Sequence, residues 1–217
     1  MSSVVDARRL DLKVASAAIR AALTSGTVTV RNADHLHGLG AGLRAGEIIV
    51  EGDAGDYVGV LNAGGTVRVI GDAGKYIADN MTAGTVIVEG DADYGVGSYC
   101  YGGMVVVKGN AGDFTAVMNK GATIIVGGNV GDEVATYMLA GDLVILGNAG
   151  RSLANYLIRG NVFIAGGWES LGHNTLVQEP TSEDVERICA YLADYGLEAD
   201  PSVFKKIVRL TDKPFYK

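Results

Sequence analysis

The three histidines, His35, His37 and His173, are the side chains best suited to acid–base or metal chemistry near neutral pH. His35 and His37 alternate along the chain and would reach one face of a strand. No third metal ligand and no nucleophile lies near them in the sequence. This isolation favours solvated or structural histidines over a metal site or a catalytic pair.

Two cysteines, Cys100 and Cys189, are the only candidate thiol nucleophiles. They lie far apart and form no C-x-x-C pair, so neither a zinc site nor a disulfide scaffold is predicted. The equivalent of Cys100 in neighbouring sequence units is Asn62, Met81, Asn119, Met138 or Leu157. A packing role is therefore predicted for Cys100.

The run Gly38-Leu39-Gly40-Ala41-Gly42 resembles a nucleotide-binding loop at first sight. A dinucleotide fingerprint would connect a strand to a helix and place an acidic residue about 20 positions later. This run leads into another strand pattern instead, so cofactor binding is not expected.

A different kind of candidate site is a protein interface, for which Trp168, Tyr99 and Tyr101 are possible aromatic surface anchors. An interface role for Trp168 or for the His35/His37 pair stays open.

The sequence is organised by a repeat of 19 residues that starts again at Gly46, Gly65, Gly84, Gly103 and onwards. The third and fifth positions of every unit are aliphatic, which is typical of a strand with one buried face. Seven units follow the rule, with these pairs: Ile48/Val50, Val67/Val69, Val86/Val88, Val105/Val107, Ile124/Val126, Leu143/Ile145 and Val162/Ile164. A looser unit begins at Gly26. Because one strand cannot bury its own face, the units must stack.

A Gly-Asx-Ala-Gly run follows each strand, as in Gly52-Asp53-Ala54-Gly55. It predicts a corner at which glycine adopts positive φ and the Asp or Asn caps local backbone. A calcium β-roll would bring several carboxylates to one ion, whereas here each unit supplies one Asx and half of these are neutral. Further along the unit, large side chains predict a second inward row: Leu61, Met81, Met118, Tyr137 and Tyr156.

These features predict a mainly β protein, a right-handed single-stranded parallel β-helix of about seven to eight coils. A left-handed hexapeptide helix is excluded, because it would have a period of about 18 and an aliphatic residue at every sixth position. We divide the chain into an N-terminal helical cap (1–25), the β-helix (26–167) and a C-terminal helical extension (168–217). Helices are predicted from Asp11 to Leu23, then after Pro180 and Ser182 up to Gly196, and from Asp200 and Pro201 through Ile207.

Composition narrows the classes of partner. Glycine supplies 32 of 217 residues, as expected for many corners, and the net charge is −7. This acidic balance disfavours nucleic acids and anionic membrane surfaces as partners. With no signal-peptide pattern and no apolar run approaching ~18 residues, we expect a cytoplasmic protein.

The phrase Gly52-Asp53-Ala54-Gly55-Asp56-Tyr57-Val58-Gly59, with Gly64-Gly65 and the later Tyr137-Met138-Leu139-Ala140-Gly141, resembles the C-terminal GXGXG domain of the glutamate synthase large subunit. The resemblance covers roughly residues 26–167. It implies an architectural β-helix, with glutamine hydrolysis and FMN and iron–sulfur chemistry located in other domains. No catalytic, cofactor-binding or metal-binding residue is therefore predicted in this chain.

Free-standing domains of this kind are similar to the small subunit of N-methylglutamate synthase (methylamine–glutamate N-methyltransferase) and to split glutamate synthases. The implied partners are an amidotransferase-like subunit and an FMN-binding subunit in a hetero-oligomer. One subunit of formylmethanofuran dehydrogenase and of the related formyltransferase/hydrolase complex carries the same repeat, with a longer N-terminal region. A stand-alone binding β-helix is the alternative of a different class.

Overall fold

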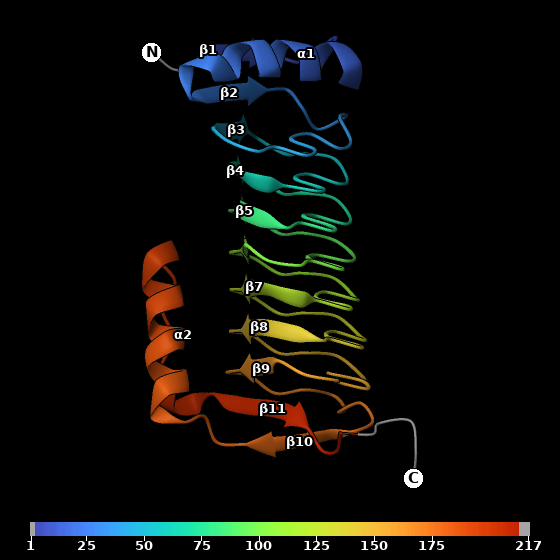
Figure 1. Cartoon of the computed structure of the whole chain (residues 1–217), viewed down its shortest axis with the longest axis vertical. Helices are drawn as coiled ribbons and strands as arrows, with labels where there is room; N and C mark the ends of the chain where they lie inside the picture. The colour runs from blue at the N-terminus through green and yellow to red at the C-terminus, as the bar shows by residue number, and fades with distance from the viewer. Residues whose placement is uncertain (1–2, 213–217) are drawn as a thin grey trace.

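In the computed structural model, which describes residues 3–212, the repeat forms a parallel solenoid (Figure 1). Nine strands stack in sequence order, and each pairs in parallel with the next. They are β1 (Ser3–Asp6), β2 (Thr27–Arg31), β3 (Glu47–Glu51), β4 (Ala63–Val69), β5 (Ala83–Val88), β6 (Met104–Val107), β7 (Lys120–Val126), β8 (Ala140–Ile145) and β9 (Asn161–Ile164). The predicted parallel β-helix is confirmed.

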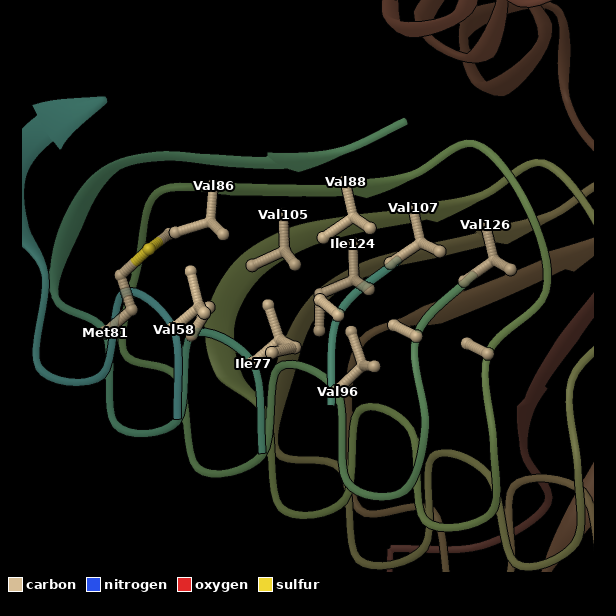
Figure 2. Close-up of a cluster of buried hydrophobic side chains, with 14 of the residues drawn as sticks. Val58, Ile77, Met81, Val86, Val88, Val96, Val105, Val107, Ile124 and Val126 are labelled. Carbon is tan, nitrogen blue, oxygen red and sulfur yellow. The ribbon is translucent and has the colours of Figure 1, made fainter. Parts of the chain in front are cut away.

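The predicted aliphatic positions build the core of the solenoid. Ile48 pairs with Val67 and Val50 with Val69, and all four side chains are buried. Figure 2 shows the same rows in later coils, where Val86, Val105 and Ile124 face Val58, Ile77 and Val96 from the opposite wall. Equivalent residues lie above one another because the strands stack in register.

The corner after each strand differs in detail from the prediction. Of the seven glycines at its first position only Gly52 has positive φ, at 97°. The others are required by close packing, since a Cβ on Gly71 would lie 2.1 Å from Asp53 Oδ1. The Asp53 side chain does not cap its own corner either. It accepts the Asp72 N–H of the next coil at 2.9 Å, 19 residues later.

This link between coils recurs through the whole Asx column. The further donors and acceptors are Asp91 N–H to Asp72, Asn110 N–H to Asp91, Asn129 N–H to Asn110, Asn148 N–H to Asn129 and Gly167 N–H to Asn148. A side chain that bonds to the neighbouring coil stabilises stacking, whereas a local cap would stabilise only its own turn. The column is therefore a ladder along the solenoid.

The loop opposite the strands contains alternating left-handed residues in every coil. In one coil Tyr76, Ala78 and Asn80 have φ of 57°, 60° and 54°. Their N–H groups alternate in direction: Tyr76 and Asn80 donate to the following coil, and Ala78 donates to Val58 O of the preceding coil. Among residues 3–212, the non-glycine residues with positive φ include none that is β-branched, in keeping with the steric cost of that region.

Because the left-handed residues alternate along the loop, the side chains of the first and third point outward and that of the second points into the core. Ala78 is fully buried, whereas Leu61 is 57% exposed. The predicted inward row is therefore wrong for Leu61, and Met118, Tyr137 and Tyr156 are only partly buried. Met81 is correctly placed. The inner row lies one residue further on and consists of Asn62, Met81, Cys100, Asn119, Met138 and Leu157, all buried.

Helix α1 (Leu12–Ala22) covers the first coil, as predicted (Figure 1). The Asp11 side chain caps it by accepting the Val14 N–H at 2.8 Å, and Ala15 and Ile19 are buried in the core. A 3-10 turn, η1 (Leu23–Ser25), leads into β2. Strand β1, which the sequence did not indicate, pairs with β2 at the edge of the sheet.

The C-terminal part contains one α-helix and two strands, so the predicted third helix is wrong. Strand β10 (Thr175–Gln178) and helix α2 (Ser182–Tyr195) precede a single 3-10 turn, η2 (Pro201–Val203), and strand β11 (Lys205–Arg209). Asp200 caps η2 in the way that an N-cap residue caps an α-helix. The chain then continues as β11, which lies antiparallel between β9 and β10. Pairing with the free edge of β9 prevails over the local helix signal.

Helix α2 packs along the outer face of the middle strands (Figure 1). Ile188 and Leu192 are buried there with Val106, Ile125, Val144 and Phe163. The helix ends at left-handed Gly196 as predicted, but Ser182 is already its first residue and the capping box is at Thr181. Across residues 3–212, no helix has the length and apolar character needed to cross a membrane.

A buried ionic cluster fixes α2 to the sheet. Arg187 Nε donates to Asp142 of β8 at 2.9 Å, and its Nη2 donates to Asp184 at 2.8 Å. Lys206 of β11 donates to Asp184 at 2.8 Å. Burial raises the pKa of Asp184, but hydrogen bonds from Lys206 and Thr181 outweigh it and lower the pKa to about 2.

Candidate functional site

The fold places His35 and His37 in the loop between β2 and β3, not on a strand as predicted, and separates them from His173. His35 Nε2 lies 3.1 Å from Leu10 O, and His37 Nδ1 accepts the Asp56 N–H at 3.0 Å, both at the first coil. His173 lies beyond β9 and contacts the Tyr156 ring at 5.4 Å. Within the described part of the chain, no group of three or more His, Cys, Asp or Glu residues could hold a metal ion. The absence of a catalytic or cofactor site stays a prediction.

The two thiols occupy different environments. Cys100 is fully buried in the inner row, and its Sγ lies 3.0 Å from the Ala78 carbonyl oxygen, to which it donates. Burial raises the pKa of Cys100 to about 12, which suppresses the thiolate. Cys189 is exposed on α2. The predicted packing role of Cys100 is confirmed by its position.

The Gly38–Gly42 run forms the left-handed loop of the first coil. Gly38, Gly40 and Gly42 have φ of 80°, 75° and 64°, at the positions occupied by Tyr57, Gly59 and Leu61 one coil later. Gly40 is also required by contact, because a Cβ there would lie 2.8 Å from Val67 Cγ2. The run continues to β3 and precedes no helix, so it lacks the geometry of a dinucleotide fingerprint.

Of the three aromatic anchors, Trp168 is only partly exposed. It forms a parallel bridge with Ala149 and packs against the core. Tyr99 and Tyr101 are 39% and 56% exposed. Lys120 Nζ lies 4.1 Å from the centroid of the Tyr101 ring and donates to its hydroxyl at 2.9 Å. Only the two tyrosines therefore offer an accessible ring surface of the predicted kind.

The structure adds two columns of rings in contact on the loop side of the solenoid, in which Tyr57–Tyr76 and Tyr137–Tyr156 are stacked, Tyr76–Tyr94 is edge-on and Tyr94–Phe114 is tilted. In the first, ring centroids are 5.1 Å apart for Tyr57–Tyr76, 5.4 Å for Tyr76–Tyr94 and 5.0 Å for Tyr94–Phe114. In the second, Tyr137 and Tyr156 stack at 5.5 Å. We call these rings, together with Tyr99 and Tyr101, the aromatic edge. Tyr57, Tyr76 and Phe114, and likewise Tyr137 and Tyr156, lie at multiples of the 19-residue period, whereas Tyr94 lies one position before Gly95 of its column. This recurrence is the signal in the sequence that could have indicated most of the rings.

The aromatic edge is suited to recognition of another protein. Tyrosine supplies a large contact area at low cost in side-chain entropy and is enriched in the energetic centres of interfaces. Neighbouring coils hold the rings in place by stacking, so little further ordering is needed on binding. Exposed Leu61 adds an aliphatic side chain to this side of the solenoid.

Comparisons with known proteins agree with this architecture. Residues 47–182 match a family described as "GXGXG motif". A solved structure of the formyltransferase/hydrolase complex from Methylorubrum extorquens, in complex with methylofuran, contains a similar chain. The TM-score is 0.53 at 25% sequence identity, and the match covers 70% of this chain and 68% of that chain. Among curated proteins, none matches the sequence significantly. Because the family match spans more than half of its length, the chain belongs to the GXGXG-motif family.

Proposed function

We propose that this chain is a non-catalytic scaffold subunit of a multi-subunit enzyme complex. The observation that carries the proposal is its similarity to a chain from an assembled enzyme complex over 70% of its own length. The stacked coils give a scaffold the rigidity that it needs, because each coil is bonded to the next through the backbone and the Asx ladder. Binding partners would then be positioned along a fixed axis.

The aromatic edge is the surface that we assign to partner contact. Tyr57, Tyr101 and Leu61 are 41%, 56% and 57% exposed. The opposite side of the middle coils is already covered by α2, which buries Ile188 and Leu192 against the strands. A partner that covers the aromatic edge would bury apolar surface that α2 leaves open.

For the complex itself, we infer a glutamate-synthase-like assembly, and specifically N-methylglutamate synthase. Support comes from the resemblance of the Gly52–Gly59 phrase and from the GXGXG-motif family match. The partners would be an amidotransferase-like subunit and a subunit that binds FMN, with an iron–sulfur cluster, in the cytoplasm. A split glutamate synthase would use the same scaffold with ammonia in place of methylamine.

A second candidate is a formyltransferase/hydrolase-type complex. The similarity to a chain of the Methylorubrum extorquens complex favours it, since that match covers 68% of the solved chain. The two candidates differ in the partner subunits and in the reaction, and both assign this chain the same scaffold role. Reconstitution with each set of partners therefore separates them.

The test combines isolation with reconstitution. The purified chain is assayed for glutaminase, glutamate synthase, methylamine transfer and formyl transfer, and we expect no turnover. It is then co-expressed with each set of candidate partners, and assembly is measured by light scattering and, for the glutamate-synthase set, by bound FMN. Robust turnover by the isolated chain, or failure to assemble with either set, would contradict the proposal.

Variants test the assigned surface. Tyr57→Glu with Tyr101→Glu should weaken assembly by at least about tenfold, because charges would replace ring contacts at the interface centre. Val203→Glu is the matched control, since Val203 is 45% exposed beside α2, away from the aromatic edge. Equal weakening by the control would show that assembly does not depend on the aromatic edge.

A further inference from the structure

A cavity of about 710 Å³ lies between helix α1 and the loop of the first coil. Helix α1 lies across the N-terminal end of the solenoid (Figure 1), and its Ala15 and Ile19 are buried. The loop from Gly38 to Ala45 forms the other wall, and Ile48 also lines the space. The volume falls within the roughly 300–1,000 Å³ of small-molecule sites.

The loop wall of the cavity is open because it carries glycines at positions where the next coil has large side chains. One coil later, the positions of Gly38 and Gly42 carry Tyr57 and Leu61. A Cβ on Gly42 would meet no atom within 4 Å, and one on Gly38 would lie 3.8 Å from Leu12. The remaining wall is apolar and includes Leu12, Leu23 and Leu43. A ligand can therefore place an apolar body against leucine side chains and bare backbone.

Two backbone donors at this wall have no partner. In the second coil, Gly59 N–H donates to Leu39 O at 2.9 Å and Ala63 N–H donates to Leu43 O at 2.8 Å. The equivalent donors of the first coil belong to Gly40 and Arg44, and no coil precedes them. Within residues 3–212 neither N–H has an acceptor, and both residues line the cavity. An acceptor group on a ligand would satisfy them.

The polar side chains around the cavity are mostly cationic. Lys13, Arg20 and Arg44 line it, all are exposed, and none forms an ion pair within the described residues. This cluster contrasts with the net charge of −7 on the whole chain. Three like charges around one opening repel one another, and a bound anion would relieve that repulsion and accept charge-assisted hydrogen bonds.

We propose that this cavity binds a small amphipathic anion, with an apolar body on the leucine wall and a carboxylate or phosphate group at Lys13, Arg20 and Arg44. Apolar walls with a few convergent polar groups are the usual composition of a ligand site. The assignment is independent of the scaffold role, because it concerns the isolated chain. It would stand even if no partner assembled on the aromatic edge.

The test uses the purified full chain and three probes: decanoate and decyl phosphate below their micelle concentrations, and neutral 1-decanol below its solubility limit. Calorimetric titration should give saturable one-to-one binding of at least one anion, with decanol weaker by at least about tenfold. Binding of only one anion identifies the preferred head group. Failure of both anions to bind would overturn the assignment and leave the cavity to a partner chain. Equal binding of decanol would overturn the role of the cations.

Variants locate the site. Arg20→Glu with Arg44→Glu should weaken anion binding by at least about tenfold, and Ala41→Trp should fill the cavity and do the same. Arg159→Glu, an exposed arginine at the far end of the solenoid, is the matched control and should leave affinity unchanged. Thermal unfolding confirms that each variant folds. Equal weakening by Arg159→Glu, or full binding by a folded Ala41→Trp variant, would show that the probes bind elsewhere.

Discussion

Replacement of Asn119 by alanine tests how the inner row holds the coils together. Asn119 is fully buried, and its Oδ1 accepts the N–H groups of Gly121 and Ala122 at 3.2 and 3.0 Å. Its Nδ2 donates to Ala122 O at 2.8 Å. Alanine removes these three bonds at the start of β7. At about 1 kcal/mol for each lost bond, Asn119→Ala should cost about 3 kcal/mol.

Asn62 provides an internal replicate, because it makes the equivalent bonds to Gly64 and Gly65 at the start of β4. The matched control is Asn110→Ala. Asn110 is exposed, accepts the Asn129 N–H at 2.9 Å and donates to Asp91 Oδ1 at 3.1 Å, and its loss should cost no more than about 1 kcal/mol because solvent can replace both bonds. Asn119 and Ala122 are both buried, so solvent does not replace the bonds between them in the same way.

The assay is urea unfolding followed by circular dichroism, with hydrogen exchange as a local measurement. Amides of Gly121 and Ala122 should exchange faster in Asn119→Ala, while amides of distant coils keep their protection, because each coil contacts only its neighbours. A stability loss no greater than that of Asn110→Ala would refute the reasoning. So would unchanged exchange at Gly121 and Ala122.

Three further predictions use other parts of the fold. Because the pKa of Asp184 is lowered to about 2, its ionised form stabilises the folded chain by on the order of 2 kcal/mol. This stabilisation is complete above about pH 4 and is lost as pH falls toward 2. Asp184→Asn should therefore make stability less dependent on pH in that window, as measured by acid unfolding. A thiol reagent at pH 8 should modify Cys189 in the native chain and reach Cys100 only in denaturant, and rapid native labelling of both would contradict the assigned burial. Gly97→Ala should destabilise the fold by about 1–3 kcal/mol, because the new Cβ would lie 2.5 Å from Ile124 Cδ1. In a double-mutant cycle measured by urea unfolding, Ile124→Ala should make that loss smaller. Strictly additive losses would show that the two residues do not compete for space.

The repeat was sufficient to predict the strands and their order. Equivalent residues such as Val67 and Val86 must lie above one another once units of equal length stack, and the observed register pairs them. The two α-helices were predicted for a local reason. Asp11 and Gly196 mark helix ends through bonds to nearby backbone, so the signal needs no tertiary information.

The left-handed conformation of the loops could not be predicted from the propensities of their residues. In the first coil Gly38, Gly40 and Gly42 occupy the three positive-φ positions, but the next coil carries Tyr57 and Leu61 at two of them. Tyrosine and leucine give no local sign of positive φ, because hydrogen bonds between coils impose that conformation. The inner row was therefore predicted one residue early, and the aromatic edge was not recognised as a column.

The third helix failed for a related reason. Asp200 and Pro201 provide a helix start, and they do begin one 3-10 turn. The conformation of the next residues depends on β9, whose free edge accepts Lys205–Ile207 as an antiparallel strand, with Ile207 buried. The local helix signal is confined to a few residues and is outweighed by the pairing of a whole strand with β9. Because β9 lies about 40 residues earlier in the chain, this pairing could not be read from the local sequence.

The ends of the solenoid have different consequences for function. At the C-terminal end the sheet is continued by β11 and β10, and residues 167–174 bond to the last loop through Ala149 N–H, Leu153 N–H and Tyr156 N–H. At the N-terminal end β1 and α1 close the strand side, while the Gly38–Gly42 loop keeps its coil-pairing N–H at Gly40 without an acceptor among the described residues. Stacking satisfies each interior coil through its neighbours, so unpaired polar groups remain where stacking stops. The glycine loop of the first coil is one such place, and the adjoining cavity and cations give it the means to bind a ligand.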